Sequence, residues 1–486
     1  MSSFTDSATA DFFRARLDHM IDLRHELAVL TSRMPWQQLE ATLAHRLSRQ
    51  AIAGKKLPGI DLFGEAIALT PRTSNAGRPR VPLRIMMALL YLQNAFNLSD
   101  EAVVARWAEN PYWQYFSGLA YFEPRPPCDG SLLVKFRKLI GEEGVEELLA
   151  QTVQLAVQLK LIRKQDLQTV VVDTTVQPKA VAHPTDSRLL EVARGKLVDA
   201  AKKSGISLKQ TFVREGAQLL RKARGYAHAR QFKRLRKAVN RQRTVLGRLL
   251  REVQRKQPEA PAGEQTLLQQ AVQKASQLHA QTAQRASRGG KGKLYAWHAP
   301  EVECISKGKA RTPYEFGVKA GICTTLKGNL IVGARSFAGN PYDGHTLHEQ
   351  LEQATIVMQE TGVKPTTAVV DLGYRGVDAL NEGVQIIHRG KRKSLTPRQR
   401  KLLKRRQSIE PVIGHLKADH RMDRCWYKGQ EGDALRTVLS AVGFNLRWLL
   451  RKIVEKGIAF FCACLFMLRQ TLIGLSRGRV QRCIGA

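Results

Sequence analysis

The sequence predicts a mixed α/β fold that is interrupted once by a helical insertion and preceded by an all-helical amino-terminal region. Short apolar runs rich in β-branched residues recur between residues 167 and 387, which is typical of buried strands. The stretch from about 186 to 292 is instead rich in Lys, Arg, Gln and Ala, which favours helices. Before residue 160, helical patterns are separated by proline and glycine.

Composition indicates a multi-domain protein with an anionic partner. The 486 residues exceed the usual size of a single hydrophobic core. Lys and Arg number 78 against 42 Asp and Glu, so the formal charge is +36. Such an excess of one sign is expected to meet nucleic acid or an acidic membrane. We expect a helical domain at 1–160, an α/β domain at 161–450 that contains the insertion at about 186–292, and a helical tail at 451–486.

A membrane or exported protein is not expected. A spanning helix needs about 18 or more apolar residues, and the longest apolar run, Gly457–Leu468, is shorter and follows Lys452 and Lys456. The first residues lack the apolar core of a signal peptide. Seven scattered cysteines without CxxC spacing argue for reduced thiols and against structural zinc. Nucleic acid is therefore the expected partner and the cytoplasm the expected location.

Two helices of the amino-terminal region could form a unit that reads DNA. Ser99 or Asp100 can cap the first helix, and Ser131 can cap the second. The second helix carries three basic residues that could meet phosphates or base edges, although basic residues on a helix are usually just solvated. They are Lys135, Arg137 and Lys138.

The first strand signal is the β-branched run 167–172, which ends at Asp173. The helical stretch follows, with a denser basic segment from Arg221 to Lys256 and an interruption at Pro258–Gly263. A helical hairpin that projects from the fold is the simplest interpretation.

Strand signals then return. A β-hairpin is predicted at 315–323 and 329–334, around a Lys327-Gly328 turn. A helix at about 345–362 precedes a second buried strand at 366–370, which ends at Asp371, and a short strand follows at 384–387. This order describes a mixed α/β layer.

Two apolar strands that both end in aspartate present their carboxylates at one edge if they pair side by side. Asp173 and Asp371 are therefore candidate metal ligands, and a third carboxylate is expected because hard cations need several anionic oxygens. Glu410 is the best candidate, in the first turn of a helix that Ser408 can cap. Singly, each acid has a plainer interpretation as a turn cap or a helix-dipole partner. Their joint pattern favours a metal site.

Two cations accompany Glu410. Lys417, seven residues on, falls on the same face of the helix. Arg406 lies one turn before Glu410 only if the helix that begins at Thr396-Pro397 continues unbroken, and Pro411 makes a kink or restart plausible.

Five segments resemble the DDE transposases of bacterial insertion sequences, in particular the insertion-sequence-five family. They are DTTVQPKAVAHPTD from Asp173, HAPEVECISKGKARTPYEFGVK from His298, GNPYDGHTL from Gly339, VVDLGYRG from Val369 and SIEPVIGHLKADHRMDR from Ser408. The segments LSDEAVVARWAENPYWQYFSG and DGSLLVKFRKLIGEEG resemble the helical amino-terminal domain of that family. Near these motifs, His345 is expected to start a helix or to pack, and Trp426 to be a core residue.

The resemblance implies a ribonuclease H-like catalytic domain and a DNA-binding or dimerisation role for residues 1–160. It carries the DDE triad of the family onto Asp173, Asp371 and Glu410, with Mg²⁺, or Mn²⁺ in its place, as the cofactor. A broader Tyr-x2-Arg-x3-Glu-x6-Lys signature maps onto Arg406, Glu410 and Lys417, but Leu403 stands where tyrosine is expected.

The implied activity is DNA transposition. Two metal ions activate water to cut at the end of the element, and the freed 3′-hydroxyl attacks target DNA. The expected partners are double-stranded DNA, as terminal inverted repeats and as target, and a second copy of the chain in a homodimer or larger assembly. In the cell the protein would be associated with the nucleoid.

Beside the metals, Arg406 and Lys417 would neutralise phosphates, and the basic insertion with Arg389, Lys391, Arg392 and Lys393 could track the flanking duplex. Two rival functions are a decayed or domesticated DNA-binding protein without chemistry, and a metal-dependent nuclease without strand transfer.

Overall fold

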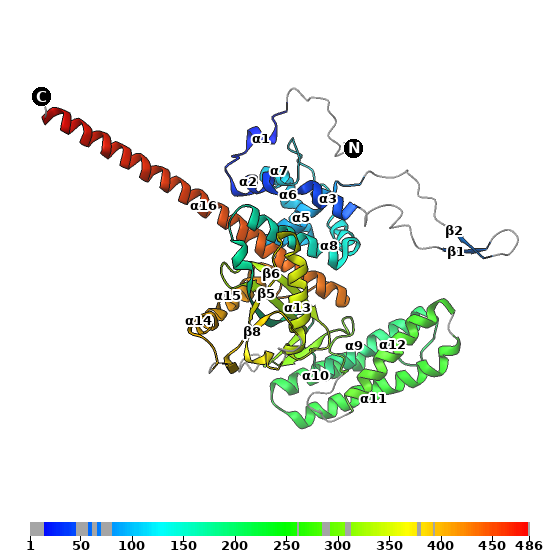
Figure 1. The fold of residues 1–486 in the computed structure, drawn as a ribbon. Coiled ribbons are helices and arrows are strands. Elements are labelled where there is room, and N and C mark those ends of the chain that lie inside the picture. Colours follow the sequence, from blue (N-terminus) through cyan, green and yellow to red (C-terminus); the bar gives the residue numbers. More distant parts are fainter. Residues whose placement is uncertain are drawn as a thin grey trace.

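The computed structural model describes residues 14–44, 57–60, 66–69, 80–259, 262–283, 292–306, 313–376, 381–391 and 394–484. Within these residues the chain forms a mixed sheet surrounded by helices, a four-helix insertion to one side and a long carboxyl-terminal helix (Figure 1). The fold is therefore mixed α/β, as the sequence predicts.

Helices make up most of the described part of the amino-terminal region. They are α1 (Leu17–Met20), α2 (Glu26–Arg33), α3 (Trp36–Ala44), α5 (Leu83–Ala95), α6 (Asp100–Glu109), α7 (Pro111–Phe116) and α8 (Gly130–Gln158). Helix α5 is buried on all sides from Ile85 to Ala95. Apart from α1, these helices share one hydrophobic core with the sheet and with α16 (Gly429–Ile484). Residue 160 therefore marks a change of secondary structure rather than a gap between two cores.

Two expectations for this region are corrected. The region is not all-helical, because β1 (Leu57–Ile60) and β2 (Ala66–Leu69) form an antiparallel pair; strands of four residues are too short to show a clear period in the sequence. Ser99 does cap α6, accepting from the Ala102 amide. Ser131 does not cap α8, because Asp129 precedes it and accepts from the Ser131 amide.

The sheet contains six strands: β3 (Thr169–Pro178), β4 (Glu303–Ser306), β5 (Tyr314–Thr325), β6 (Ile331–Phe337), β7 (Thr367–Val369) and β8 (Gln385–Ile387). Strand β5 pairs antiparallel with β3 on one side and with both β4 and β6 on the other. Strands β3, β7 and β8 are parallel neighbours. The predicted β-hairpin is confirmed as β5 and β6, whereas β4 was not predicted.

The insertion between β3 and β4 contains four helices: α9 (Asp186–Lys203), α10 (Val213–His228), α11 (Phe232–Lys256) and α12 (Ala262–Gln281). Helices α9, α11 and α12 pack around their own core, which includes Leu190, Leu197, Leu246, Leu249 and Leu268, and α10 lies against α9 and α11. The expectation of a simple hairpin is therefore wrong. Three amphipathic helices can bury their apolar stripes against one another, which two helices alone cannot do fully.

Four helices complete the fold: α13 (Asp343–Val357), α14 (Pro397–Arg405), α15 (Ile409–Asp419) and α16. The first half of α16 is buried between α5, α8 and β6, and the helix then continues away from the core (Figure 1). No helix in the described part of the chain is long and apolar enough to cross a membrane. Four described cysteines are free thiols, whereas the side chains of Cys462, Cys464 and Cys483 lie outside the described residues.

Candidate active site

The parallel pairing of β3 and β7 brings Asp173 and Asp371 to one edge of the sheet. Val171 is the partner of Val369, the last pair of this ladder, and each aspartate lies two residues further along its own strand direction. The sequence predicts that the first strand ends at Asp173. Instead, β3 continues to Pro178, because it pairs with β5 over this length. The longer antiparallel partner carries β3 past the end of β7 and leaves Asp173 beside the Asp371 turn.

Arg406 connects the two aspartates. Its Nη1 lies 3.1 Å from Asp173 Oδ2 and its Nη2 lies 3.7 Å from Asp371 Oδ2. The backbone is helical through Arg405, Arg406, Ser408 and Ile409, so Arg406 does lie one turn before Glu410. Ser408 does not cap α15, because it is itself helical and its side chain makes no cap hydrogen bond.

Asp173 is a carboxylate in a partly desolvated and partly anionic environment. Its side chain is 20% exposed, and its Oδ1 accepts from the Thr174 amide at 2.9 Å. Burial raises the pKa of Asp173 and the charge of Asp371 adds to this, whereas Arg406 and the Thr174 amide oppose it without cancelling it. Such a pair of carboxylates gains from any cation placed between them.

Asp343 is a third carboxylate at this edge, and it was not among the residues predicted from the sequence. A methyl group added at Gly373 would lie 3.1 Å from an oxygen of Asp343 and 3.1 Å from an oxygen of Asp371, so the two acids flank one glycine. Asp343 Oδ1 also accepts from Thr174 Oγ1 at 2.9 Å and from Lys319 Nζ at 2.7 Å. The only sequence signal was an acidic residue inside the GNPYDGHTL motif.

Tyr374 lies beneath these three acids. It is 1% exposed, and its hydroxyl has no hydrogen-bond partner among the described residues. Burial raises the pKa of Tyr374 well above its ordinary value, and the charges of Asp173, Asp343 and Asp371 raise it further. The phenol is therefore neutral and lies close enough to all three acids to feel their charge.

Glu410 does not join the aspartates in this structure. It occupies the first turn of α15, as predicted, but it is exposed. Among the described residues, no group of three or more His, Cys, Asp or Glu side chains is close enough together to hold a metal ion. In donor chemistry the edge suits a hard divalent cation, because Asp173, Asp371 and Asp343 offer only oxygen.

The remaining cations near this edge differ in exposure. Lys417 is half-buried, and its Nζ lies 3.6 Å from Glu315 Oε2 on β5. Leu403 lines a basic recess together with Arg389, Pro397, Arg400, Lys401 and Lys404. Arg389 follows β8, a parallel neighbour of β7, so this recess belongs to the same side of the sheet as the aspartates. Lys391 is half-buried, whereas Arg392 and Lys393 lie outside the described residues.

The three basic residues predicted to contact DNA on α8 differ in exposure. Lys135 and Lys138 are exposed. Arg137 is 3% exposed, donates from Nη1 and Nη2 to the two Asp100 oxygens at 2.7 Å each, and lies over the Tyr427 ring. The expected DNA contact of Arg137 is therefore corrected, because its guanidinium is buried in an ion pair.

Two motif residues can also be placed. His345 lies in the first turn of α13, as predicted. Trp426 is 61% exposed, with Arg424 stacked 4.6 Å from the centre of its ring, so the expectation of a core residue is wrong. Trp426 follows Cys425, which is buried and forms an isolated bridge with Lys179 just after β3; successive side chains of an extended segment point to opposite sides, so the ring faces away from the core.

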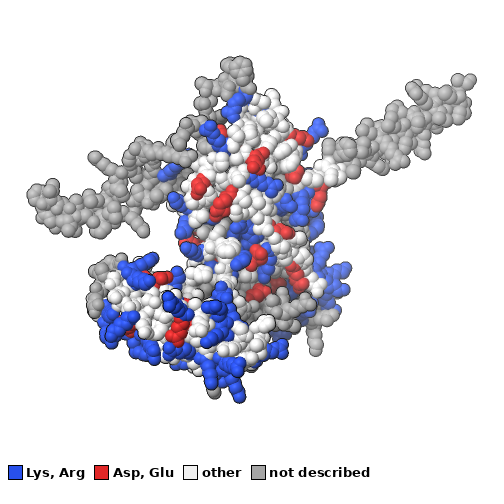
Figure 2. Space-filling model, turned by 180° about the vertical axis from the view of Figure 1, so that it is seen from behind, with Lys and Arg blue, Asp and Glu red and all other residues white. Residues whose placement is uncertain are grey.

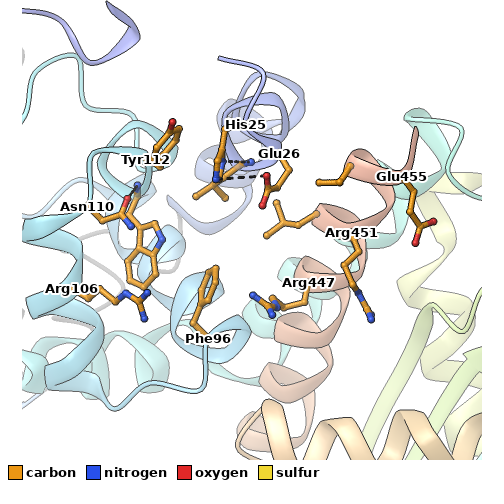
Figure 3. Close-up of a pocket in the computed structure, with 13 residues that line it drawn as sticks. His25, Glu26, Phe96, Arg106, Asn110, Tyr112, Arg447, Arg451 and Glu455 are labelled. Atoms are coloured by element: carbon orange, nitrogen blue, oxygen red, sulfur yellow. Dashed lines mark hydrogen bonds and ion pairs between the residues drawn. The ribbon is translucent and has the colours of Figure 1, made fainter. Parts of the chain in front are cut away.

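A recess away from the carboxylates lies where α2, α6 and α7 face α16 (Figure 3). Three of its polar residues contact aromatic rings: Arg106 lies 5.2 Å from the ring centre of Trp113, Arg447 lies 5.1 Å from that of Phe96, and the ring centres of His25 and Tyr112 are 4.2 Å apart. These contacts assign the recess to the packing of the amino-terminal helices against α16.

Comparisons with known proteins identify the family of this chain. Residues 15–139 match the family described as Transposase domain (DUF772), and residues 282–446 match the family described as Transposase DDE domain. The second match contains Asp371, Arg406 and Glu410, whereas Asp173 precedes it. A curated relative from Rhizobium meliloti, named "Uncharacterized protein ORF8 in nfe locus", is 42% identical over 226 residues, which are 46% of this chain and 97% of the relative. No solved structure matches the chain. The chain belongs to the DDE transposases of insertion sequences.

Proposed function

We propose that this transposase binds the terminal inverted repeats of its element, cleaves the DNA at their ends and joins the freed 3′-hydroxyl to target DNA, and that it belongs to the insertion-sequence-five subfamily. The observation that carries the chemistry is the pair Asp173 and Asp371, held side by side by Arg406. The strand order β6–β5–β3–β7–β8, antiparallel and then parallel, supports a ribonuclease H-like fold for the catalytic domain.

The proposed metal ligands are Asp173, Asp371 and Glu410, with Mg²⁺, or Mn²⁺ in its place, as the cofactor. Glu410 is included because it lies one helical turn after Arg406, the residue that contacts both aspartates. Bound divalent ions would lower the pKa of the attacking water or hydroxyl and stabilise the leaving oxygen of each in-line displacement. Asp343 is the alternative third acid, because it already lies beside Asp371.

The residues of the chain itself have distinct tasks in this proposal. Asp173 and Asp371 provide the negative charge, and Thr174 and Gly373 fix their orientation through backbone amides. When no metal ion is bound between the two carboxylates, Arg406 balances their negative charge and keeps them close together. Lys417, paired with Glu315, places a second positive charge on α15 that can neutralise a phosphate.

DNA would approach across the basic recess of α14. Arg389, Arg400, Lys401 and Lys404 surround an apolar floor that includes Leu403, and such a cluster suits phosphate oxygens. Lys135 and Lys138 on α8 are further proposed contacts, as are Lys391, Arg392 and Lys393. Because two element ends must be brought together, we also propose a homodimer or larger assembly, bound to the nucleoid in the cytoplasm.

The triad is tested by replacing each carboxylate with its amide: Asp173→Asn, Asp371→Asn and Glu410→Gln. Cleavage and strand transfer with labelled element-end DNA and Mg²⁺ should fall by at least about 10²-fold in each case, because charge at the reacting phosphate is lost. Binding to the same DNA should persist, because it depends on many Lys and Arg contacts. Asp199→Asn, an exposed change on α9, serves as the matched control.

The outcomes separate the alternatives. A Glu410→Gln variant with wild-type activity, together with an inactive Asp343→Asn variant, would make Asp343 the third acid. Cleavage by the wild type without joining would indicate a nuclease, and binding without cleavage would indicate a DNA-binding protein that has lost its chemistry. Either of these two results would overturn the proposed activity.

A further inference from the structure

The hairpin formed by α10 and α11 concentrates positive charge that the fold does not use. Residues 213–256 contain 15 Lys and Arg but only two acids, Glu215 and Glu252. Both acids are already paired, Glu215 with Arg241 at 2.6 Å and Glu252 with Lys256 at 3.2 Å. In the described part of the insertion, the other cations of this hairpin form no salt bridge. Their mutual repulsion must be offset by an external anion.

The part of the hairpin before Val245 contributes little to the core of the insertion. Helix α10 buries only Gly216 and Ala223. Helix α11 buries its apolar stripe mainly from Val245 onward, so its first turns project. Figure 2 shows the insertion, at the lower left, with many Lys and Arg on its visible surface and fewer acids between them.

The tip of the hairpin combines charge with an exposed aromatic ring. Phe232 is the first residue of α11 and is 62% exposed. Five exposed basic residues surround it in sequence, and together they are named the tip cluster here: Arg230, Lys233, Arg234, Arg236 and Lys237. An apolar side chain among cations is the combination that DNA-bending proteins place in the minor groove.

The position of the insertion connects it to the reaction. Strand β3 leads into α9 from the end that lies beyond Asp173, the same edge at which Asp371 lies. DNA that reaches the carboxylates therefore passes the side of the sheet from which the insertion leaves.

We propose that the α10–α11 hairpin is a duplex-DNA-binding arm, with the tip cluster on phosphates and Phe232 against the minor groove. This inference rests on the proposed function, because it takes DNA as the substrate, but the surface that it names lies in the insertion and away from the carboxylates. Proteins that bind single strands stack successive bases on several aromatic side chains. The tip offers a single aromatic ring, so duplex DNA is the favoured ligand.

The test measures binding of a 30-base-pair duplex by fluorescence anisotropy without divalent metal, at several salt concentrations. The tip variant carries Lys233→Gln, Arg234→Gln, Arg236→Gln and Lys237→Gln. Its matched control carries Lys160→Gln, Lys164→Gln, Lys327→Gln and Lys364→Gln, exposed lysines near the opposite edge, where β3 and β7 begin. Circular dichroism checks that both fold. Both variants lose four positive charges, so a difference between their affinities for the duplex shows that the position of the charges matters.

The tip variant should bind at least about tenfold more weakly than the control, and its slope of log affinity against log salt should fall by about three to four. Equal weakening of both variants would show diffuse attraction only and would overturn the inference. Tighter binding of a matched RNA duplex than of the DNA duplex would also overturn it.

Phe232 is tested separately. Phe232→Ala should weaken duplex binding several-fold with an unchanged salt slope, because an apolar contact releases no counterions. Phe232→Trp should retain binding. Wild-type affinity of Phe232→Ala would remove the minor-groove contact from the proposal.

Failure here is distinguishable from failure of the proposed function. A tip variant with normal affinity, alongside inactive carboxylate variants and an active wild type, would refute the arm and leave the transposase chemistry intact. A wild-type protein that binds DNA through the tip cluster but does not cleave it would support the arm and refute the proposed transposase chemistry.

Discussion

Arg137 illustrates, at the scale of single residues, how burial decides what a cation does. Burial alone would raise the pKa of Asp100, but the hydrogen bonds and charge of Arg137 outweigh it and lower that pKa. Arg137 is in turn stacked on Tyr427, which connects α8 to the segment before α16. The pair therefore joins α6, α8 and the carboxyl-terminal part of the chain.

Removing one partner of this pair should be costly. Asp100→Asn leaves a buried guanidinium without its counter-charge, and we expect a loss of about 3–5 kcal/mol in the free energy of unfolding at pH 7. Because the folded pKa of Asp100 lies below its unfolded value, the stabilisation is present above about pH 4 and is lost as pH falls through the folded pKa. Urea unfolding at pH 7 and pH 3 measures both. A difference between wild type and variant that does not shrink at pH 3 would contradict the assignment.

Between elements, close packing decides which glycines can be replaced. A methyl group at Gly443 on α16 would lie 2.4 Å from backbone atoms of Asn94 on α5, whereas at Gly457, on the same helix, it would meet nothing within 4 Å. Gly443 thus lets the backbones of α5 and α16 approach closely. This contact lies at the centre of the shared core.

Gly443→Ala and Gly457→Ala should therefore change stability in opposite directions. In an exposed helix, Ala is more favourable than Gly by about 1 kcal/mol, which is the expectation for Gly457→Ala. For Gly443→Ala the overpacking should exceed this gain and destabilise by about 1–3 kcal/mol. Thermal unfolding of the two variants beside wild type measures the contrast. Equal stabilisation of both would mean that α5 and α16 do not approach as described.

The elements also show what a sequence can and cannot predict. Val170–Val172 and Thr367–Val370 were identifiable as strands because β-branched runs have a local signature, and both aspartates were found through them. The pairing of Arg137 with Asp100, 37 residues away, has no such signature. Asp343 was missed for the same reason, because its neighbours Lys319, Thr174 and Gly373 come from three different elements.

Local ambiguity explains the remaining errors. Asp129 and Ser131 are both good cap residues two positions apart, and only the backbone geometry chooses between them. Trp426 was assigned to the core on residue type alone, although the loop that carries it is held at the surface. The four-helix packing of the insertion depends on which apolar faces meet, and this is a property of distant contacts.

For the whole molecule, charge sets the behaviour toward DNA. The full chain carries a formal charge of +36, and Lys and Arg gather on the visible face of the helical insertion (Figure 2), so phosphate contacts should dominate the affinity for any duplex. Each contact releases condensed counterions, and this release weakens as the salt concentration rises. Affinity for an unrelated duplex should therefore fall steeply with salt, whatever its sequence.

A protein that makes about six to ten phosphate contacts loses about 10³- to 10⁵-fold in affinity between about 50 and 200 mM salt. We expect the intact chain to fall in this range on a duplex that lacks the element ends. The double variant Asp173→Asn with Asp371→Asn should show the same slope, because two acids at the edge of the sheet do not contact phosphates directly and no metal is present in the assay. Titrations by anisotropy at four or more salt concentrations give the slope. A dissociation constant that hardly changes over this interval would mean that the positive charge serves another anion, and that binding to the element ends depends on base contacts instead.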